Sequence, residues 1–347
     1  MKAMLLPERG PIETSPLVLT DLPDPSPAAG EIRVKISACG ICRTDLHVIE
    51  GDLPPLRSPV IPGHQIVGTV DACGDGAARF PRGSRVGIAW LARTCGECHY
   101  CAAGRENLCD RPWFTGYHRD GGFAEYAVVP EAFAYPLPSA FRDAEAAPLL
   151  CAGIIGFRAL RRADLPRGGT LAIYGFGSSA HIVIQLALHR GCPVFVCTRG
   201  KEHRALAKRM GAAWAGENPE EMPALADSAI LFAPAGELVP RALKYLKKGG
   251  TLSLAGIHMS DIPSMKYEEC LFHEKNVRSV TANTRQDGEE LLREAAEIPL
   301  RPKVTLFPLE EANRALQLLK ADKLQGTGVL QISGTRNRCG TGMEITK

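Results

Sequence analysis

The chain has 347 residues, of which 45% are hydrophobic and 23% are charged, and its formal net charge is +3. This length exceeds what one hydrophobic core usually organises, so we expect two domains. The composition excludes a disordered chain, and the near balance of charge excludes the broad basic surface of a nucleic-acid-binding protein. Residues 1–30 have no apolar signal core, and no apolar run approaches the roughly 18 residues that a membrane helix needs. We therefore expect a cytoplasmic protein without a membrane or nucleic-acid partner.

The first part of the chain, residues 1–151, has the sequence pattern of a β domain. It is rich in proline and glycine and contains short β-type runs, for example at residues 31–37 and 123–129. Such runs between turn-forming residues predict a compact, mostly β domain with functional loops.

Four cysteines lie close together within this part of the chain. They are separated by two, two and seven residues, and they are Cys95, Cys98, Cys101 and Cys109. Four thiolates on one tight loop can surround a zinc ion tetrahedrally, so the spacing predicts a structural zinc site. A disulfide pair is the alternative, which a cytoplasmic compartment disfavours. A zinc-ribbon interaction module is also disfavoured, because the stretch lacks a basic and aromatic face.

A second set of metal-ligating residues is more dispersed. Cys42, His64 and Cys151 together offer two thiolates and an imidazole, which leave one tetrahedral position open. An open position is the mark of a catalytic zinc, since water or a substrate oxygen can occupy it. The spacing of these three residues does not by itself decide between a zinc site and ordinary structural roles.

From residue 152 the pattern changes to alternating strands and helices. Strands are expected at residues 170–174, 194–197, 229–232, 251–255 and 278–281, and helices at residues 179–190, 201–210 and 237–247. This alternation predicts βαβ units on a doubly wound parallel sheet, which we place at residues 152–290. A last strand is expected at residues 328–332, and the tail at 334–347 is expected to be disordered because it has no apolar pattern.

The first strand-to-helix turn of this domain carries a glycine motif. Gly175, Gly177, Ser178 and Ala180 belong to a G-x-G-x-x-A run that follows a predicted strand and opens a predicted helix. Gly175 would allow the sharp turn, and Gly177 would let a pyrophosphate approach bare backbone at the helix N-terminus. The motif predicts a dinucleotide site.

The end of the second strand indicates which nicotinamide coenzyme is bound. An NAD site usually places an acidic residue there for the ribose hydroxyls, but this chain has Thr198 followed by Arg199 and Lys201. Because an arginine can pair bidentately with a 2′-phosphate, we favour NADP(H) over NAD(H). The alternative is that Arg199 and Lys201 are solvated residues at a helix start.

These motifs together resemble one family over almost the whole chain. The matching segments are G-I-C-R-T-D-L-H at 40–47, P-G-H at 62–64, the four-cysteine stretch, L-C-A-G at 150–153 and the G-x-G-x-x-A turn. The chain is similar to the zinc-dependent alcohol dehydrogenases of the medium-chain dehydrogenase/reductase family. The resemblance implies a GroES-like catalytic domain formed by residues 1–151 and 291–333, with a Rossmann coenzyme domain between them. It also implies that Cys42, rather than Cys39, is the zinc ligand.

The resemblance further implies an activity and roles for individual residues. It implies two zinc ions per chain, a homo-oligomer that is a tetramer or a dimer, and hydride transfer between NADP(H) or NAD(H) and a primary aliphatic, allylic or aromatic alcohol held as a zinc-bound alkoxide. Thr44 would hydrogen-bond the substrate oxygen, and His47 would pass the proton to solvent. Asp45 would fix the tautomer of His64, and Arg43 would contact the coenzyme pyrophosphate.

Two residues depart from the family pattern. Gln65 stands where the family usually has glutamate beside the zinc histidine, and Gln325 stands where it often has a second pyrophosphate arginine. Gln65 leaves open a catalytically disabled family member, and a zinc polyol dehydrogenase that uses NAD(H) is a second alternative, which differs in cofactor and substrate preference. The resemblance also implies that four residues lie near the substrate, and they are Leu53, Trp90, Leu91 and Phe114. Their apolar character favours apolar alcohols over sugar acids or phosphorylated substrates.

Overall fold

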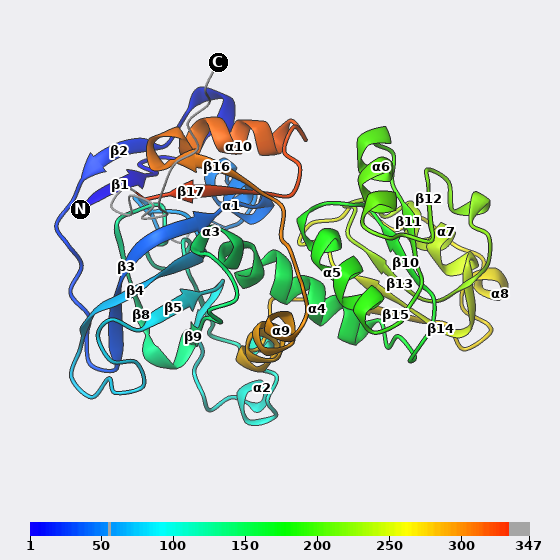
Figure 1. Ribbon diagram of the computed structural model, residues 1–347, viewed down its shortest axis with the longest axis horizontal. Helices are drawn as coiled ribbons and strands as arrows, with labels where there is room; N and C mark the ends of the chain where they lie inside the picture. The colour runs from blue at the N-terminus through cyan, green and yellow to red at the C-terminus, as the bar shows by residue number, and fades with distance from the viewer. Residues whose placement is uncertain (55–56, 333–347) are drawn as a thin grey trace, which may run out of the picture.

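The computed structural model describes residues 1–54 and 57–332, so the tail expected at 334–347 lies outside the described residues. Figure 1 shows two bodies side by side, with the N-terminus in one and the six-stranded sheet in the other. Helices α4 (Ala152–Arg162) and α9 (Arg285–Glu297) lie between them.

The N-terminal body is built on a seven-stranded sheet in which β16, β17, β3, β4, β5 and β9 are neighbours in that order and β8 also pairs with β3. Its strands are β3 (Glu31–Gly40), β4 (Gln65–Cys73), β5 (Arg85–Ile88), β8 (Tyr126–Pro130), β9 (Ala134–Pro136), β16 (Val304–Pro308) and β17 (Thr327–Gln331). Strand β3 buries Ile32, Val34 and Ile36 on one face, as the alternation in its sequence requires.

Shorter elements complete this body. The paired strands are β1 (Lys2–Leu5) with β2 (Val18–Asp21) and β6 (Leu91–Arg93) with β7 (Trp113–Phe114). The helices are α1 (Arg43–Glu50), α2 (His99–Ala102), α3 (Asp143–Ala146) and α10 (Ala312–Lys320). Single 3-10 turns lie at η1 (Ile12–Thr14), η2 (Glu106–Leu108), η3 (Glu131–Phe133), η4 (Ala147–Leu150) and η6 (Leu309–Glu311).

The two ends of the chain meet in this sheet. Strand β17 pairs antiparallel with β3, so that Leu330 lies opposite Cys39. The chain therefore leaves the N-terminal body, forms the second body, and comes back. This pairing supports our proposal that the catalytic domain consists of residues 1–151 and 291–333.

The second body is a parallel sheet with the strand order β12-β11-β10-β13-β14-β15, which is the doubly wound order 3-2-1-4-5-6. Its strands are β10 (Leu171–Tyr174), β11 (Val194–Cys197), β12 (Trp214–Gly216), β13 (Ala226–Leu231), β14 (Leu246–Leu254) and β15 (Asn276–Ser279). The further elements here are α5 (Ser178–His189), α6 (Lys201–Arg209), η5 (Pro219–Glu221), α7 (Leu238–Lys244) and α8 (Tyr267–Cys270). Every residue of β10 and β11 is buried, as expected for strands covered on both faces.

Two details of this body differ from the sequence-based expectation. Strand β12 (Trp214–Gly216) was not predicted, because three residues that include a glycine carry no recognisable strand pattern. The helix expected at residues 237–247 ends at Lys244, since β14 already begins at Leu246. Sheet pairing with β13 overrides the helix-forming preference of the lysines at this point.

An apolar core joins the two bodies. It combines Val67 and Leu150 from the N-terminal body with Ile154 of α4, Ile173 of β10 and Leu291 of α9. Because α4 and α9 bury side chains against both sheets, the apolar contact fixes the relative position of the two bodies. No helix of the described residues is long and apolar enough to cross a membrane.

Candidate active site

The first site forms where β3 ends and α1 begins. Cys42 is the N-cap of α1, and its backbone N–H donates to Oδ2 of Asp45 at 2.8 Å. The other carboxylate oxygen of Asp45 accepts from Nδ1 of His64 at 3.0 Å. Asp45 and His64 are each only 1% exposed, so this hydrogen bond is shielded from water. It assigns Nδ1 as the protonated nitrogen and leaves Nε2 free to bind a metal.

The three dispersed ligands predicted from the sequence meet here. The ligand atoms of Cys42, His64 and Cys151 all lie within 4.8 Å of one another. Cys42 Sγ is 3.9 Å from Cys151 Sγ and 3.3 Å from His64 Nε2. Two sulfurs bound tetrahedrally to zinc at about 2.3 Å lie about 3.8 Å apart, so the donor set fits zinc and leaves one position open.

The two thiols of this site differ in acidity. The hydrogen bond with Cys151 lowers the pKa of Cys42 well below its usual value. The same contact, together with burial, raises the pKa of Cys151. Because zinc binds cysteine as the thiolate, loading the site would release the protons that these thiols carry.

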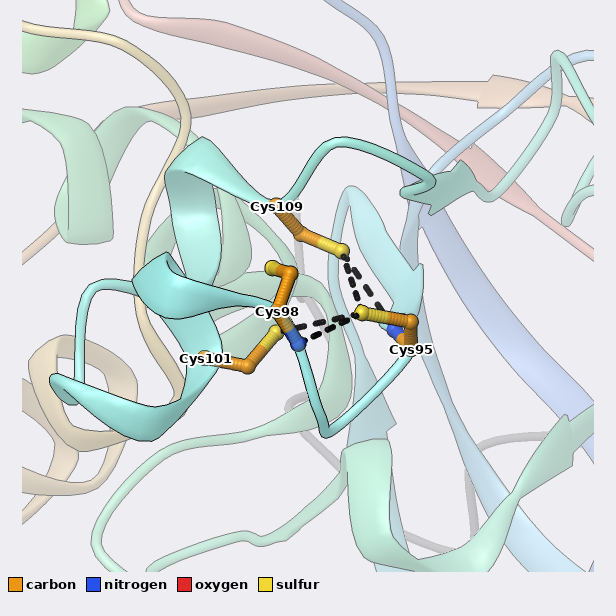
Figure 2. Close-up of side chains that lie close together, drawn as sticks. All are labelled: Cys95, Cys98, Cys101 and Cys109. Atoms are coloured by element: carbon orange, nitrogen blue, oxygen red, sulfur yellow. Dashed lines mark hydrogen bonds between the residues drawn. The ribbon is translucent and has the colours of Figure 1, made fainter.

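The four-cysteine stretch forms a second metal site, in a lobe that contains α2. Figure 2 shows the four side chains converging from both limbs of the loop. Cys95 Sγ lies 3.9 Å from Cys101 Sγ and 3.5 Å from Cys109 Sγ, and all four sulfurs lie within 4.8 Å of one another. Backbone N–H groups of Cys98 and Glu97 lower the pKa of Cys95 to about 6. All cysteines of the described residues are free thiols, so the disulfide alternative does not hold for this lobe.

An aromatic wall stands beside the first site. The Trp90 ring contacts the His64 ring edge-on at a centroid distance of 5.0 Å. It stacks on Phe114 at 4.8 Å and lies near Tyr117 at 6.0 Å. Leu91 is fully buried and lies opposite Phe114 in the pairing of β6 with β7, and Leu53 is partly buried against the same core. Aromatic rings therefore lie directly beside the metal ligand His64.

Helix α1 also carries the three residues expected to handle substrate, proton and coenzyme. Thr44 is half-buried, and its hydroxyl hydrogen-bonds Cys42 Sγ and helps to lower the pKa of that thiol. Nδ1 of His47 lies 2.7 Å from Oδ2 of Asp52, and the His47 ring lies 6.2 Å from that of His258. Arg43 is exposed at the first turn of the helix. His258 was not predicted, since nothing in its sequence neighbourhood indicates a site.

The glycine turn follows the first strand of the parallel sheet, as predicted. Gly175 has φ +86°, and a Cβ there would lie 2.9 Å from the backbone nitrogen of Ala233. Gly177 is the N-cap of α5, and a Cβ there would meet nothing within 4 Å. Ala180 is buried where α5 packs on the sheet. The turn lies between β10 and β13, where the strand order reverses and dinucleotides bind in this fold.

The side chain of Ser178 makes hydrogen bonds that the glycine motif did not predict. Its hydroxyl lies 2.8 Å from the carbonyl oxygen of Gly326 and 2.6 Å from the hydroxyl of Thr327, both at the start of β17. The side chain therefore ties the coenzyme domain to the catalytic domain, and the backbone N–H of Ser178 stays available for a ligand.

The end of β11 contains one residue that sequence reasoning missed. Arg204 donates to the carbonyl oxygens of Thr198 at 2.9 Å and Arg199 at 2.6 Å, and it pairs with Glu217 at 3.1 Å. Arg204 thereby fixes the backbone at the end of β11, where an NAD site usually has the acidic residue that binds the ribose hydroxyls. Arg199 and Lys201 are exposed. Within the described part of the chain, neither side chain has a hydrogen bond or an ion pair.

The two departures from the family pattern have different surroundings. Gln65 is fully buried, and neither polar atom of its side chain has a hydrogen-bond partner among the described residues. Gln325 donates to Glu202 of α6 at 3.0 Å and accepts from Lys303. It therefore links the two domains beside the glycine turn.

Comparison with known proteins agrees with this geometry. Residues 28–139 match the family model "Alcohol dehydrogenase GroES-like domain", and residues 180–297 match "Zinc-binding dehydrogenase". A protein of Mycobacterium tuberculosis (strain CDC 1551 / Oshkosh), described as "Probable alcohol dehydrogenase AdhA", is 50% identical over 337 residues, which cover 96% of this chain and 97% of that protein. The chain belongs to the zinc-containing medium-chain alcohol dehydrogenases.

Solved structures show that this alcohol dehydrogenase has the family fold over almost all of the chain. One described as an NAD-dependent alcohol dehydrogenase has a TM-score of 0.87 at 27% identity and covers 96% of this chain and 100% of its own. Another, a zinc-binding dehydrogenase from Sinorhizobium meliloti 1021 bound to NADP, has a TM-score of 0.82 at 27% identity and covers 95% and 98%. Since both coenzymes occur among such neighbours, the fold alone does not assign the coenzyme of this enzyme.

The hydrogen bond from His64 to Asp45 leads to a test of zinc affinity. Asp45→Asn should weaken zinc binding at the first site about 10- to 100-fold, because the amide no longer orients the imidazole as a carboxylate does. Zinc retained per chain during competition with a chelator, counted by mass spectrometry, measures the effect. Asp52→Asn removes a carboxylate from His47 instead and should leave the zinc content unchanged. Equal zinc retention in the two variants would contradict the role of Asp45.

Proposed function

We propose that this alcohol dehydrogenase oxidises primary aliphatic, allylic or aromatic alcohols and reduces the corresponding aldehydes, with NADP(H) preferred over NAD(H). The observation that carries the substrate class is the Trp90 ring, which stands edge-on to His64 and stacks on Phe114. An apolar wall at this distance from the metal ligands favours an alcohol with an apolar chain or ring. The hydroxyl of Tyr117 in this wall is already engaged, because it donates to the carbonyl oxygen of Pro54 at 2.6 Å.

The protein groups divide the chemistry between them. Cys42, His64 and Cys151 would hold the catalytic zinc, and Cys95, Cys98, Cys101 and Cys109 would hold the structural zinc. When bound, the catalytic zinc acts as a Lewis acid that favours the deprotonated alcohol, and the nicotinamide exchanges hydride with the substrate carbon. The backbone N–H groups at the start of α5, after Gly175 and Gly177, are oriented to receive the coenzyme pyrophosphate, and exposed Arg43 adds a positive charge for it.

Proton movement is assigned to α1. Thr44 and His47 are three residues apart, so their side chains lie on the same side of the helix. The Thr44 hydroxyl would accept the proton of the alcohol oxygen while it donates its own, and His47 would carry it toward water. His47 is 19% exposed and hydrogen-bonded to the exposed Asp52, which gives the proton a route out of the site.

The coenzyme preference rests on the end of β11. Thr198 provides no carboxylate for a ribose 2′-hydroxyl, and the carboxylates of Glu217 and Glu202 already bind Arg204 and Gln325. Arg199 and Lys201 point their unpaired charges to solvent at this edge, where a 2′-phosphate would lie. We further propose a cytoplasmic homo-oligomer, a dimer or a tetramer, on the family resemblance.

Initial rates on zinc-counted protein test the proposed function. We expect two zinc ions per chain and faster reduction of benzaldehyde, cinnamaldehyde and butanal with NADPH than with NADH. Faster turnover with NADH, restricted to polyols and their ketones, would favour the polyol alternative. Two zinc ions without turnover on either substrate class would indicate a disabled enzyme and direct attention to Gln65.

Arg199 is the residue to change for coenzyme choice. Arg199→Gln should lower kcat/KM for NADPH by about 10- to 100-fold, since a charge-assisted contact contributes roughly 1.5 to 3 kcal/mol. The kcat/KM for NADH should stay within about twofold of that of the unchanged enzyme, because NADH has no 2′-phosphate. Arg209→Gln, at the last residue of the helix that follows Arg199, is the matched control. A parallel loss with both coenzymes would rule out Arg199 as the reader of the phosphate.

The proton route through His47 predicts a change in pH dependence. His47→Gln should lower kcat for alcohol oxidation by about 100-fold at neutral pH, because an amide cannot accept and release the proton. The loss should shrink as the pH rises and hydroxide becomes an alternative acceptor. Steady-state rates across pH measure this, with exposed His189→Gln as the control. An unchanged pH profile in His47→Gln would refute the relay.

A further inference from the structure

A basic cavity borders the four-cysteine lobe, and its lining contains no zinc ligand and no residue of the glycine turn. It has a volume of about 290 Å³ and lies between the four-cysteine lobe, α4, β15 and the start of α9. Five arginines and one acid among its lining residues set its charge, and they are Arg105, Arg158, Arg161, Arg162, Arg278 and Asp287. None of the residues assigned above to zinc, substrate or coenzyme lines it.

Three of the five arginines have acidic partners. Arg158 bonds Asp287 at 2.6 Å, and Arg161 reaches the same carboxylate at 3.4 Å. Arg161 also pairs with Glu290 at 2.7 Å, and Arg278 lies 3.6 Å from Asp164. Counting these three acids against the five arginines leaves a local charge of +2.

The remaining two arginines account for this excess. Within residues 1–54 and 57–332, neither Arg105 nor Arg162 has a carboxylate partner. Arg105 lies over the Tyr100 ring at 5.6 Å. Burial lowers the pKa of Arg162 below its usual value. The nearby positive charges of Arg158, Arg278 and Arg105 lower it further, so Arg162 lies among other cations. Positive groups held together this way stabilise an anion placed among them.

Buried donors without partners point to the same conclusion. The Nε atoms of Arg158 and Arg162 are inaccessible to solvent and have no hydrogen-bond partner among the described residues. Leaving such donors unpaired costs free energy that a ligand oxygen would recover. The buried Asn107 Oδ1 is also unpartnered, and its orientation is fixed because Nδ2 donates to the carbonyl oxygen of Thr281 at 2.8 Å. It offers an acceptor for an acidic hydroxyl.

We propose that this cavity binds a phosphate group, either free inorganic phosphate or a small phosphate monoester. Arginine forks match phosphate oxygens bidentately, which suits Arg105 and Arg162. Inorganic phosphate keeps one protonated oxygen at neutral pH that can donate to Asn107 Oδ1, and a hydroxyl of the organic part of a monoester can do the same, whereas a carboxylate ion has no proton to donate. The volume falls at the lower end of small-molecule pockets, so the ligand is a small ion or ester rather than a nucleotide.

The position of the cavity gives the bound phosphate a structural consequence. Arg105 and Asn107 belong to the four-cysteine lobe, whereas Arg162 and Arg278 belong to the coenzyme domain. These two parts already touch through the ion pair between Glu106 and Arg285, at 2.6 Å. A phosphate between them adds a second link and would stabilise the zinc lobe against the coenzyme domain.

Calorimetric titration of the zinc-loaded protein tests this proposal. Coenzyme is kept at saturation so that its own phosphate site is filled, and the probes are inorganic phosphate in one arm and glycerol 3-phosphate in the other. We expect one site per chain for at least one probe, and the tighter probe identifies the source of the phosphate. Loss of one charged contact should raise the Kd about 10- to 100-fold in Arg162→Gln and in Arg105→Gln.

Two controls make the outcome decisive. Arg82→Gln removes an exposed arginine elsewhere and should leave the Kd within about twofold. Arg105 is exposed on the lobe, so its substitution preserves the fold even if Arg162→Gln destabilises the protein. Absence of binding by both probes, or a Kd that is the same in Arg105→Gln as in the unchanged protein, would overturn the proposal. The result is independent of which alcohol or coenzyme the enzyme uses.

Discussion

The buried carboxylate of Asp45 is the constraint on which the catalytic centre depends. Burial raises its pKa, and an ionised carboxylate in this place is tolerable only because both oxygens are used. One oxygen caps the backbone at Cys42 and the other holds the ring of His64. A single group thereby fixes two metal ligands from separate segments. The third ligand, Cys151, is the N-cap of α4. The chain passes from the N-terminal body to the parallel sheet through this helix.

The fold places this centre where the coenzyme can reach it. The return of β16 and β17 to the N-terminal sheet closes the catalytic domain around an inserted parallel sheet. The apolar core shared through α4 and α9 then sets the distance between the metal ligands and the glycine turn. Trp90 borders the metal ligands within the catalytic domain. Its ring contacts His64 edge-on and would offer an apolar surface to an alcohol bound beside the metal.

The sequence predicted those features that are local or periodic. The four cysteines lie within 15 residues, so the chain itself keeps them close, and the strand and helix alternation sufficed for the parallel sheet. Cys42, His64 and Cys151 are far apart in the sequence, and only the family resemblance brought them together. Sequence reasoning missed the contacts of Arg204 and the isolated side chain of Gln65, because both depend on tertiary packing. Sequence reasoning missed the arginine cavity for the same reason, since tertiary packing brings Arg105, Arg162 and Arg278 together from different parts of the chain.

The hydroxyl of Ser178 has a consequence for how this enzyme moves. It sits on the first residue of α5, next to the turn expected to hold the pyrophosphate, and it is bonded to Gly326 and Thr327 of the catalytic domain. Any rotation that separates the domains must stretch these bonds, which lie beside the backbone that we propose binds the coenzyme pyrophosphate. Coenzyme affinity and the interdomain angle are therefore thermodynamically linked, and by reciprocity a bound coenzyme must favour one angle over the others. The resistance of the two domains to rotation would then depend in part on whether the coenzyme is bound.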